Sequence, residues 1–246
     1  MPAEEAITFK NVSFAFDHFP VLEKVDIKIS KGDFIGVVGP NGGGKTTFLK
    51  LICGLLEPTK GKVFIFGKRP SEFYPKISYV PQVSKIERDF PISLLELVML
   101  GAVNNCKSAF FSEKQEKERL RKKALKLIKQ LGLLNYQHQA FGTLSGGQAQ
   151  KALIAKALIS DPEIVVLDEP TANIDVKGER VVFDLIKKEL KGKTILMVSH
   201  DLNIVIKDVK KIIFVDEKTV SSKLPHEVCE HFALGLYHQK LLKKPR

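Results

Sequence analysis

GPNGGGKTT, at residues 39–47, is a glycine-rich run between two segments of different pattern. The residues before it, DFIGVVG (33–39), are apolar and β-branched and end in glycine, which predicts a buried strand. The residues after it, TTFLKLICG (46–54), have helical apolar spacing and a glycine stop. The sequence therefore predicts a strand, a glycine-rich loop and a helix, the arrangement that cradles a phosphate group.

The glycine-rich run matches G-x-x-x-x-G-K-[ST], with Gly39, Gly44, Lys45 and Thr46 in the fixed positions. Glycines let backbone N–H groups turn inward, and a helix start offers free donors and the positive end of its dipole to an anion. Lys45 would then neutralise β- and γ-phosphates, and the Thr46 hydroxyl would bind Mg²⁺. The alternative, a turn that merely links strand and helix, is disfavoured by all four matches in this context.

Two runs of alternating apolar residues precede the loop, at 6–16 and 20–33, with a turn near 17–20. This pattern predicts an antiparallel pair of strands that leads into the phosphate-loop strand. Phe16 ends the first run, and its ring could stack on a purine. It could equally be a core or edge-strand residue.

The segments after the loop change from strands to helices. Strands are expected within residues 57–68 and 76–82, and the second is interpreted as a central strand ending at Gln82. The Gln82 amide could reach a bound ion or water from the edge of the sheet, although a lone glutamine is more often just a polar strand end. From DFPISLLELVMLG (89–101) to about residue 134 the pattern is helical, without a strand candidate. We therefore expect a helical subdomain, about residues 90–160, inserted into the sheet domain.

A second glycine pair lies in TLSGGQAQKALIAKAL, residues 143–158. Ser145, Gly146 and Gly147 open a helix whose apolar residues follow the 3.6-residue period. Free backbone donors, a hydroxyl and a positive dipole end make such an opening an anion site. S-G-G taken alone would indicate an ordinary serine-capped helix, but the upstream phosphate loop favours the anion site.

Two carboxylates follow the apolar strand IVVL (164–167) in DPEIVVLDEPTANID. Ligands of parallel α/β sheets bind at the carboxyl ends of the strands, so Asp168 could hold Mg²⁺ and Glu169 could activate a water aimed at the γ-phosphate. KTILMVSHD (193–201) predicts another buried strand that ends at His200. That histidine could donate to the γ-phosphate, although a lone histidine is more often structural.

The bulk composition of the 246 residues is that of a globular protein with a formal charge of +11. Much of the excess lies in 114–129, which alternates charged and apolar residues as a solvated amphipathic helix does, and in the terminal KLLKKPR. Contact of these residues with acidic lipid or nucleic acid is the alternative. No apolar run approaches the roughly 20 residues of a membrane helix, so we expect a cytoplasmic protein that could dock on a membrane partner.

The cysteines are three, odd in number and far apart. Cys53, Cys106 and Cys229 suggest neither a disulfide framework nor a C-x-x-C metal site. We expect three thiols, with Cys53 in the core.

In the order GPNGGGKTT, Gln82, LSGGQ, IVVLDE, TANID and His200, these features resemble the ATP-binding subunit of an ABC transporter. The resemblance covers about residues 7–215, and LSGGQ beside a phosphate loop is highly specific. It implies an α/β fold: a P-loop NTPase (RecA-like) core with an N-terminal antiparallel β subdomain and an inserted α-helical subdomain. The ATPase domain would occupy residues 1–222, followed by a tail at 223–246.

The resemblance also implies roles for single residues in a head-to-tail homodimer that sandwiches two ATP molecules. Phe16 matches the adenine-stacking aromatic, more often tyrosine, and Lys45, Glu169 and His200 match the catalytic residues. The implied Mg²⁺ residues are Thr46, Gln82 and Asp168, and Gln82 also senses the membrane subunit. The implied ATP-binding residues are Phe16, Gly39, Asn41, Gly42, Gly43, Gly44, Lys45, Thr46, Thr47, and, from the signature and inter-subunit loop, Ser145, Gly146, Gly147, Gln148 and Asp175.

Two departures from the family pattern are visible. Lys151 and Lys156 replace arginines that usually follow the signature, which keeps the charge but not the bidentate geometry. TANID stands where many members have S-A-L-D. The chain looks most like ATPases of zinc and manganese importers in three features, which are the TANID variant, GPNGGGKTT and DFPISLLELVMLG.

The implied function is ATP hydrolysis that powers import, of zinc or manganese in particular. The implied partners are a second copy, two integral membrane permease subunits and, indirectly, an extracytoplasmic substrate-binding protein, with no nucleic acid; the chain would sit on the cytoplasmic face of the membrane. The alternatives are an ATPase subunit of an iron-siderophore or cobalamin importer and a soluble ABC ATPase that works on DNA or ribosomes. DNA-repair relatives need a long coiled-coil insertion, and ribosome-associated ones usually carry two cassettes; neither feature is present.

The tail contains a possible metal-sensing set, His226, Cys229, His231 and His238. His226 and Cys229 are spaced i, i+3, as on one helical face, and the other two are two turns apart. Ordinary surface residues are the alternative and are favoured.

Overall fold

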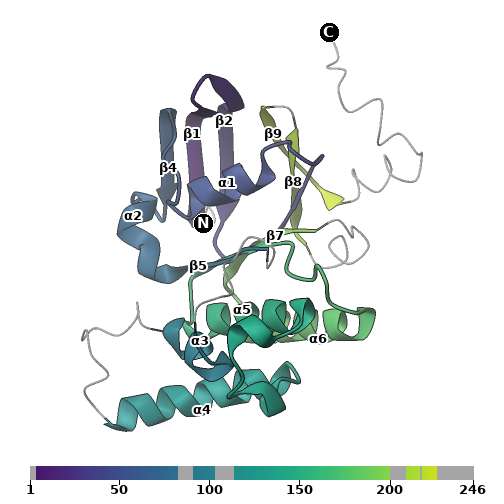
Figure 1. The fold of residues 1–246 in the computed structure, drawn as a ribbon. Helices are drawn as coiled ribbons and strands as arrows, with labels where there is room; N and C mark the ends of the chain where they lie inside the picture. Colours follow the sequence, from purple (N-terminus) through teal and green to yellow (C-terminus); the bar gives the residue numbers. More distant parts are fainter. Residues whose placement is uncertain (1–3, 83–90, 103–113, 200–208, 217, 226–246) are drawn as a thin grey trace.

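The computed structural model of the protein describes residues 4–82, 91–102, 114–199, 209–216 and 218–225, and Figure 1 shows their arrangement. Its strands form two sheets. The first is antiparallel, in the order β2-β1-β4, and comprises β1 (Glu5–Phe16), β2 (Phe19–Ser30) and β4 (Lys60–Ile65). The expected N-terminal pair of antiparallel strands is confirmed, with its turn at residues 17–18.

The second sheet has six strands in the order β5-β6-β7-β3-β8-β9. All pairs are parallel except β8 with β9. Its strands are β3 (Phe34–Val38), β5 (Ile77–Val80), β6 (Ile164–Asp168), β7 (Thr194–Val198), β8 (Lys211–Asp216) and β9 (Thr219–Lys223).

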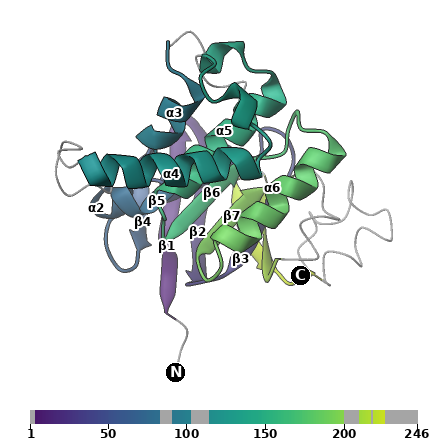
Figure 2. The same ribbon diagram turned by 90° about the horizontal axis from the view of Figure 1, so that it is seen from below.

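The helices cover this sheet on both faces (Figures 1 and 2). They are α1 (Lys45–Ile52), α2 (Pro70–Phe73), α3 (Leu94–Leu100), α4 (Lys114–Gln130), α5 (Gly146–Ile159) and α6 (Val176–Glu189). Three short 3₁₀ helices in the described part of the chain are labelled η1 (Tyr74–Lys76), η4 (Leu134–Tyr136) and η5 (Phe141–Thr143). The expected α/β class is confirmed.

Alternate residues of β6 enter two different cores, because successive side chains of a strand point to opposite faces. Ile164 and Val166 join α1 and the antiparallel sheet, whereas Val165 and Leu167 join α3, α4, α5 and α6. A strand with both faces covered must be apolar throughout, which explains the uninterrupted run that the sequence shows. The described helices of the expected 90–160 subdomain thus share one core with the sheet, and the division of the chain into domains stays a prediction.

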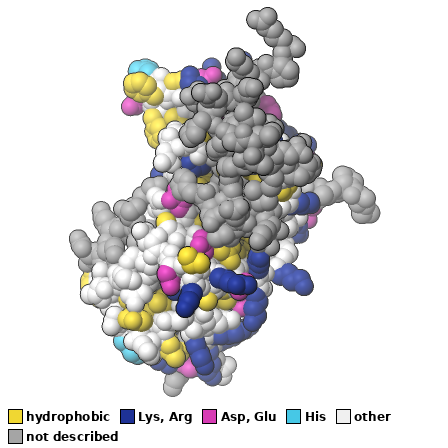
Figure 3. Space-filling model, turned by 90° about the vertical axis from the view of Figure 1, so that its right-hand side faces the viewer, with side chains coloured by type: hydrophobic (Ala, Val, Ile, Leu, Met, Phe, Trp, Pro, Cys, Tyr) yellow, Lys and Arg dark blue, Asp and Glu magenta, His cyan; other side chains and the backbone are white. Residues whose placement is uncertain are grey.

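Helix α4 is the expected solvated amphipathic helix. Ala124, Leu127 and Ile128 are buried, while most of its described charged side chains are exposed. Figure 3 shows lysine and arginine side chains gathered over the helical half of the molecule. No helix in the described part of the chain is both long and apolar enough to span a membrane.

One sequence expectation is corrected by the fold. The strand before Gln82 is an edge strand of the six-stranded sheet, not a central one, and it ends at Val80.

The helix expected after Ser145 is confirmed as α5. It is buried on nearly all sides, because it lies between the sheet and α3 and α4. A periodicity argument cannot foresee this, since alanines and Gln150 fill its remaining buried positions.

Candidate nucleotide-binding site

The glycine-rich loop joins the end of β3 to the start of α1, as predicted. Gly39 has φ +150°, and a Cβ there would lie 1.9 Å from the carbonyl oxygen of Val215 on β8. Gly44 caps α1 in the left-handed region, with φ +97° and Val21 of β2 close by. Both positions require glycine, since a side chain would meet neighbouring backbone or strain the turn.

Lys45 bends back over the loop rather than into solvent. Its Nζ donates to the carbonyl oxygens of Gly39, at 2.9 Å, and Pro40, at 2.8 Å. The side chain is 8% exposed, although it carries a charge. A buried ammonium is held in place by such hydrogen bonds, so the loop presents a positioned positive charge beside the first turn of α1.

Asp168, the last residue of β6, accepts two hydrogen bonds on one carboxylate oxygen. The hydroxyl of Thr46 donates to Oδ2 at 3.1 Å, and the hydroxyl of Tyr79 donates to the same atom at 3.2 Å. Burial, followed by the negative charge of Asp168, raises the pKa of Tyr79, so its hydroxyl stays protonated and acts as a donor. The strand-end position predicted for Asp168 is confirmed.

Tyr79 was missed by the sequence analysis, which singled out only Gln82 on this segment. Its partner across the parallel pair is Val166, two residues before Asp168 and on the same face of β6. The diagonal neighbour of a large side chain lies within its reach. The tyrosine itself is visible in the sequence. Only the register of β5 on β6 shows that its side chain can reach Asp168.

Glu169 leaves the strand with φ +53°, in the left-handed region, and Gln82 donates its amide to the Glu169 carboxylate. A non-glycine residue in this region is uncommon and occurs often at functional sites. The two neighbouring acidic residues therefore have different partners: Thr46 and Tyr79 for Asp168, and Gln82 for Glu169.

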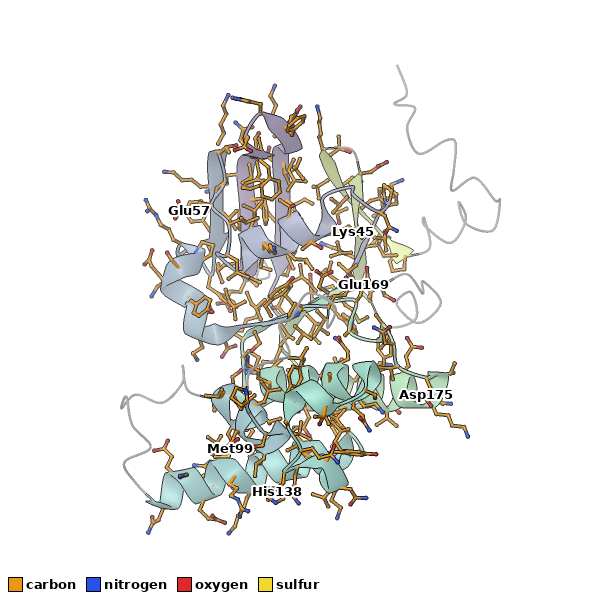
Figure 4. All side chains as sticks on the ribbon, in the orientation of Figure 1. Lys45, Glu57, Met99, His138, Glu169 and Asp175 are labelled. Atoms are coloured by element: carbon orange, nitrogen blue, oxygen red, sulfur yellow. The ribbon has the colours of Figure 1, made fainter. Side chains whose placement is uncertain are left out.

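These side chains surround one cavity of about 440 Å³. In Figure 4, Lys45 and Glu169 are labelled within this region of the molecule, at the carboxyl ends of the parallel strands. The lining is Asn41, Gly42, Gly44, Lys45, Thr46, Thr47, Gln82, Asp168 and Glu169. The structure thus brings together the predicted phosphate loop, Gln82 and the two carboxylates.

The predicted second anion site lies elsewhere, at the start of α5. Ser145 caps the helix: its hydroxyl accepts from the Gln148 N–H at 3.3 Å, and the Gln148 side chain accepts from the Ser145 N–H at 2.9 Å. A Cβ on Gly147 would lie 2.7 Å from the carbonyl oxygen of Asn173. This opening therefore packs on the loop before α6, and it is not part of the cavity lining described above.

Asp175 also belongs to this second region. It caps α6, where its Oδ1 accepts from the Gly178 N–H at 3.2 Å. Figure 4 shows it on the helical side of the molecule, apart from Lys45 and Glu169. The structure thus gives Asp175 a helix-capping contact that the sequence analysis did not foresee.

The close approach at Gly147 leads to a stability prediction. Gly147→Ala should lower the free energy of unfolding by about 1–3 kcal/mol, because the new methyl group must displace the backbone at Asn173. Gly146→Ala is the matched control, since its Cβ would lie 3.5 Å from the Asn173 side chain, an ordinary contact. Urea unfolding of both variants measures the difference, and equal midpoints would contradict the expectation.

Phe16 ends β1 beside the turn of the hairpin. It is 50% exposed, and its ring packs edge-on against Phe14 with 4.8 Å between the ring centroids. The hairpin reaches the phosphate loop through Val21 and Leu22, which approach Gly44. An exposed aromatic ring is thereby available near the loop, and stacking on adenine stays a prediction.

Some predicted residues lie outside the described part of the chain. These are His200, Cys106 and the tail residues His226, Cys229, His231 and His238. Cys53 is confirmed as a core thiol, 2% exposed, and burial raises its pKa.

A second cavity of about 540 Å³, which we call the side groove, lies at the β5 edge of the six-stranded sheet. β5, the end of α1, α3 and α5 form it, and its lining is mostly apolar, with exposed Leu55, Tyr74 and Leu100. Lys156 also borders it, and burial lowers the pKa of this lysine. Tyr79 borders the side groove as well, while its hydroxyl contacts Asp168 of the first cavity.

Comparisons with known proteins agree with this geometry. The family model described as ABC transporter matches residues 22–172. The zinc uptake system ATP-binding protein ZurA of Listeria monocytogenes is 33% identical over 94% of this chain and 90% of its own length. The manganese transport system ATP-binding protein MntB of Bacillus subtilis is 36% identical over 80% of this chain and 77% of its own.

Two solved structures are similar along most of the chain. A dimeric, post-hydrolysis state of the ATP-binding cassette MJ0796 with ADP and Pi has a TM-score of 0.78 and 29% identity, covering 89% of this chain and 98% of that one. An inward-facing ABC transporter assigned to the metal-chelate type has a TM-score of 0.76 and 26% identity, covering 96% and 89%.

Proposed function

The chain belongs to the ABC transporter family as an ATPase, and from this we propose that it powers import of a divalent metal ion, zinc or manganese. One observation carries the ATPase chemistry: a single cavity brings the Lys45 ammonium, the Thr46 hydroxyl and the carboxylates of Asp168 and Glu169 together. The metal substrate is supported by the names of the relatives, which belong to a zinc uptake system and a manganese transport system.

Within the cavity, the loop N–H groups and Lys45 bind the β- and γ-phosphates of ATP. Thr46, Asp168 and Gln82 supply hydroxyl, carboxylate and amide oxygens, which are the ligands that Mg²⁺ prefers, so the residues present fit this ion. Mg²⁺ bound there would neutralise charge on the phosphates. The hydroxyls of Thr46 and Tyr79 donate to the Asp168 carboxylate and hold it in its orientation beside the cavity.

Glu169 is proposed as the general base. It lies next to Asp168 but has a separate partner, the amide of Gln82, which can hold the carboxylate in position to accept a proton from water. The water would attack the γ-phosphate, with Lys45 stabilising the charge on the phosphate oxygens. His200 is proposed as a further donor to the γ-phosphate, and Phe16 as the ring that stacks on adenine.

The site is proposed to be completed by a second copy of the chain. The signature residues Ser145–Gln148 present a helix N-terminus, yet they lie apart from the phosphate loop within one copy. A head-to-tail pair would bring this anion site onto the γ-phosphate from the other side. Dimeric cassettes occur among the similar structures.

The remaining partners are two membrane permease subunits, which would hold the chain at the cytoplasmic face, and an extracytoplasmic substrate-binding protein that acts through them. We propose that an apolar helix of the permease occupies the side groove. The groove exposes large apolar side chains next to the β5 segment that leads to Gln82, and Gln82 contacts Glu169. Movement of a helix in this groove could therefore reach the catalytic carboxylate.

The permease contact gives a prediction. Leu100→Asp should weaken retention of the permease about tenfold or more, because a carboxylate would be buried in an apolar interface. Leu134→Asp is the matched control, since Leu134 is likewise an exposed leucine of the helical half but does not border the groove. Affinity purification of the tagged chain from detergent-solubilised membranes measures the recovered permease. Equal recovery with both variants would contradict the groove assignment.

The substrate is tested by uptake of radioactive zinc, manganese and an iron–siderophore complex. Cells that lack the gene are compared with the same cells carrying it on a plasmid. The proposal expects uptake of zinc or manganese to depend on the plasmid while the iron complex enters equally in both. Dependence of the iron complex alone would favour the siderophore or cobalamin alternative, to which the similarity with a metal-chelate type transporter points.

A further inference from the structure

We propose that Tyr79 is a positioning residue that holds the magnesium-side carboxylate Asp168 and links it to the side groove. This inference rests on the proposed ATPase mechanism and on the proposed permease contact. Among the residues whose placement is described, Tyr79 combines two contacts: its side chain borders the side groove, and its hydroxyl donates to a residue that lines the nucleotide cavity.

One oxygen atom of Asp168 accepts from two hydroxyl groups. Thr46 and Tyr79 both donate to Oδ2 of Asp168, at 3.1 and 3.2 Å. The Thr46 hydroxyl is the group offered to Mg²⁺, and it can bind the ion through its oxygen while its O–H still donates to Asp168. Tyr79 does not line the nucleotide cavity, so its donation to Oδ2 does not depend on the ion and orients the carboxylate with and without Mg²⁺.

The strands that carry Tyr79 and Asp168 are rigidly connected. Tyr79 lies on β5, which pairs with β6 in a regular parallel register from Ile77 to Val80. Asp168 ends β6, so donor and acceptor are fixed to neighbouring strands of one sheet. A hydrogen bond between two such elements transmits small displacements, because strands of a packed sheet move together rather than independently.

Tyr79 and Gln82 lie close together along the chain. The two residues lie three positions apart on one segment, and they contact two adjacent carboxylates: Tyr79 that of Asp168 and Gln82 that of Glu169. A helix that presses on the β5 wall of the side groove would therefore shift both carboxylates. The groove and the cavity have no lining residue in common; Tyr79 is the groove residue whose hydrogen bond reaches the magnesium-side carboxylate, whereas Gln82, next to Pro81 of the groove, reaches Glu169.

The first experiment measures binding to the purified full chain of AMP-PNP, an ATP analogue whose imido bridge between the β- and γ-phosphates resists hydrolysis. Affinity is determined in EDTA and in Mg²⁺ for wild type, Tyr79→Phe and Tyr74→Phe. Tyr79→Phe should leave the affinity in EDTA unchanged and reduce the enhancement by Mg²⁺ about tenfold, as expected for loss of a hydrogen bond to a charged group. Tyr74 borders the same groove and has no hydrogen bond to Asp168, so Tyr74→Phe should keep the full enhancement.

The second experiment reports on the groove itself. The sequence contains no tryptophan, so Leu100→Trp introduces a single tryptophan on the groove wall, which is excited selectively over the tyrosines. Mg²⁺ with AMP-PNP should shift its emission, because coupling between two sites is reciprocal. The shift should disappear when Leu100→Trp is combined with Tyr79→Phe and persist when it is combined with Tyr74→Phe.

The outcomes separate this inference from the function on which it rests. An unchanged Mg²⁺ enhancement in Tyr79→Phe would overturn the positioning role, and an emission shift that survives Tyr79→Phe, or is absent with Tyr79 intact, would overturn the link to the groove. Failure of the wild-type chain to bind AMP-PNP would overturn the proposed ATPase mechanism, and this inference with it.

Discussion

Lys45→Ala is expected to reduce ATP hydrolysis by the purified protein about 10²–10³-fold or more, the size of effect seen when one positioned donor is removed from a developing charge. The structure holds the Lys45 ammonium between two loop carbonyls and beside the first turn of α1, where the β- and γ-phosphates would lie. Alanine removes the one cationic side chain among the described residues that line this cavity. Metal uptake should therefore stop in cells whose only copy of the gene carries Lys45→Ala.

The control for this variant is Lys50→Ala. Lys50 lies on the same helix, in its last turn, and does not line the cavity. Thermal unfolding of both variants shows whether loss of the Gly39 and Pro40 contacts also loosens the fold. Hydrolysis by Lys45→Ala within tenfold of wild type, in a folded protein, would contradict the assignment of the phosphate site.

Glu169→Gln is expected to slow hydrolysis about 10²–10⁴-fold, the usual contribution of a general base. Glutamine keeps the shape of the side chain but cannot accept the proton of the attacking water. ATP binding should therefore remain within a few fold of wild type, because Lys45 and the loop are untouched. Single-turnover hydrolysis and equilibrium binding measure the two quantities separately.

Glu163→Gln is the matched control for Glu169→Gln. Glu163 directly precedes β6, at the end of the strand opposite to Glu169, and it lies near Lys76 and Lys193 on the surface. It should retain hydrolysis, since partly exposed ion pairs contribute little. If both variants hydrolysed ATP at the wild-type rate, Glu169 would not be the base.

The local motifs were predictable because each depends on a few consecutive residues. Gly39–Thr47 fixes a strand, a loop and a helix start through backbone requirements that only glycine meets. Ser145 and Gln148 form a capping box within four residues. Asp168 falls at the end of a strand that is apolar throughout, and the sequence pattern shows this directly.

Features that depend on distant pairing were not predictable. The placement of β5 at the sheet edge, the burial of α5 on nearly all sides and the capping role of Asp175 each require neighbours that the sequence pattern does not name. The contact of Tyr79 with Asp168 belongs to this class, since it follows from the register of β5 on β6.

Short runs of sequence encode the chemical groups: a phosphate loop, its lysine, two adjacent carboxylates and a signature helix, each with a backbone geometry that is local. Which of these groups meet depends on the tertiary structure. It joined Lys45, Gln82, Asp168 and Glu169 in one cavity and set the signature apart, because strand order and register bring together segments that are remote along the chain.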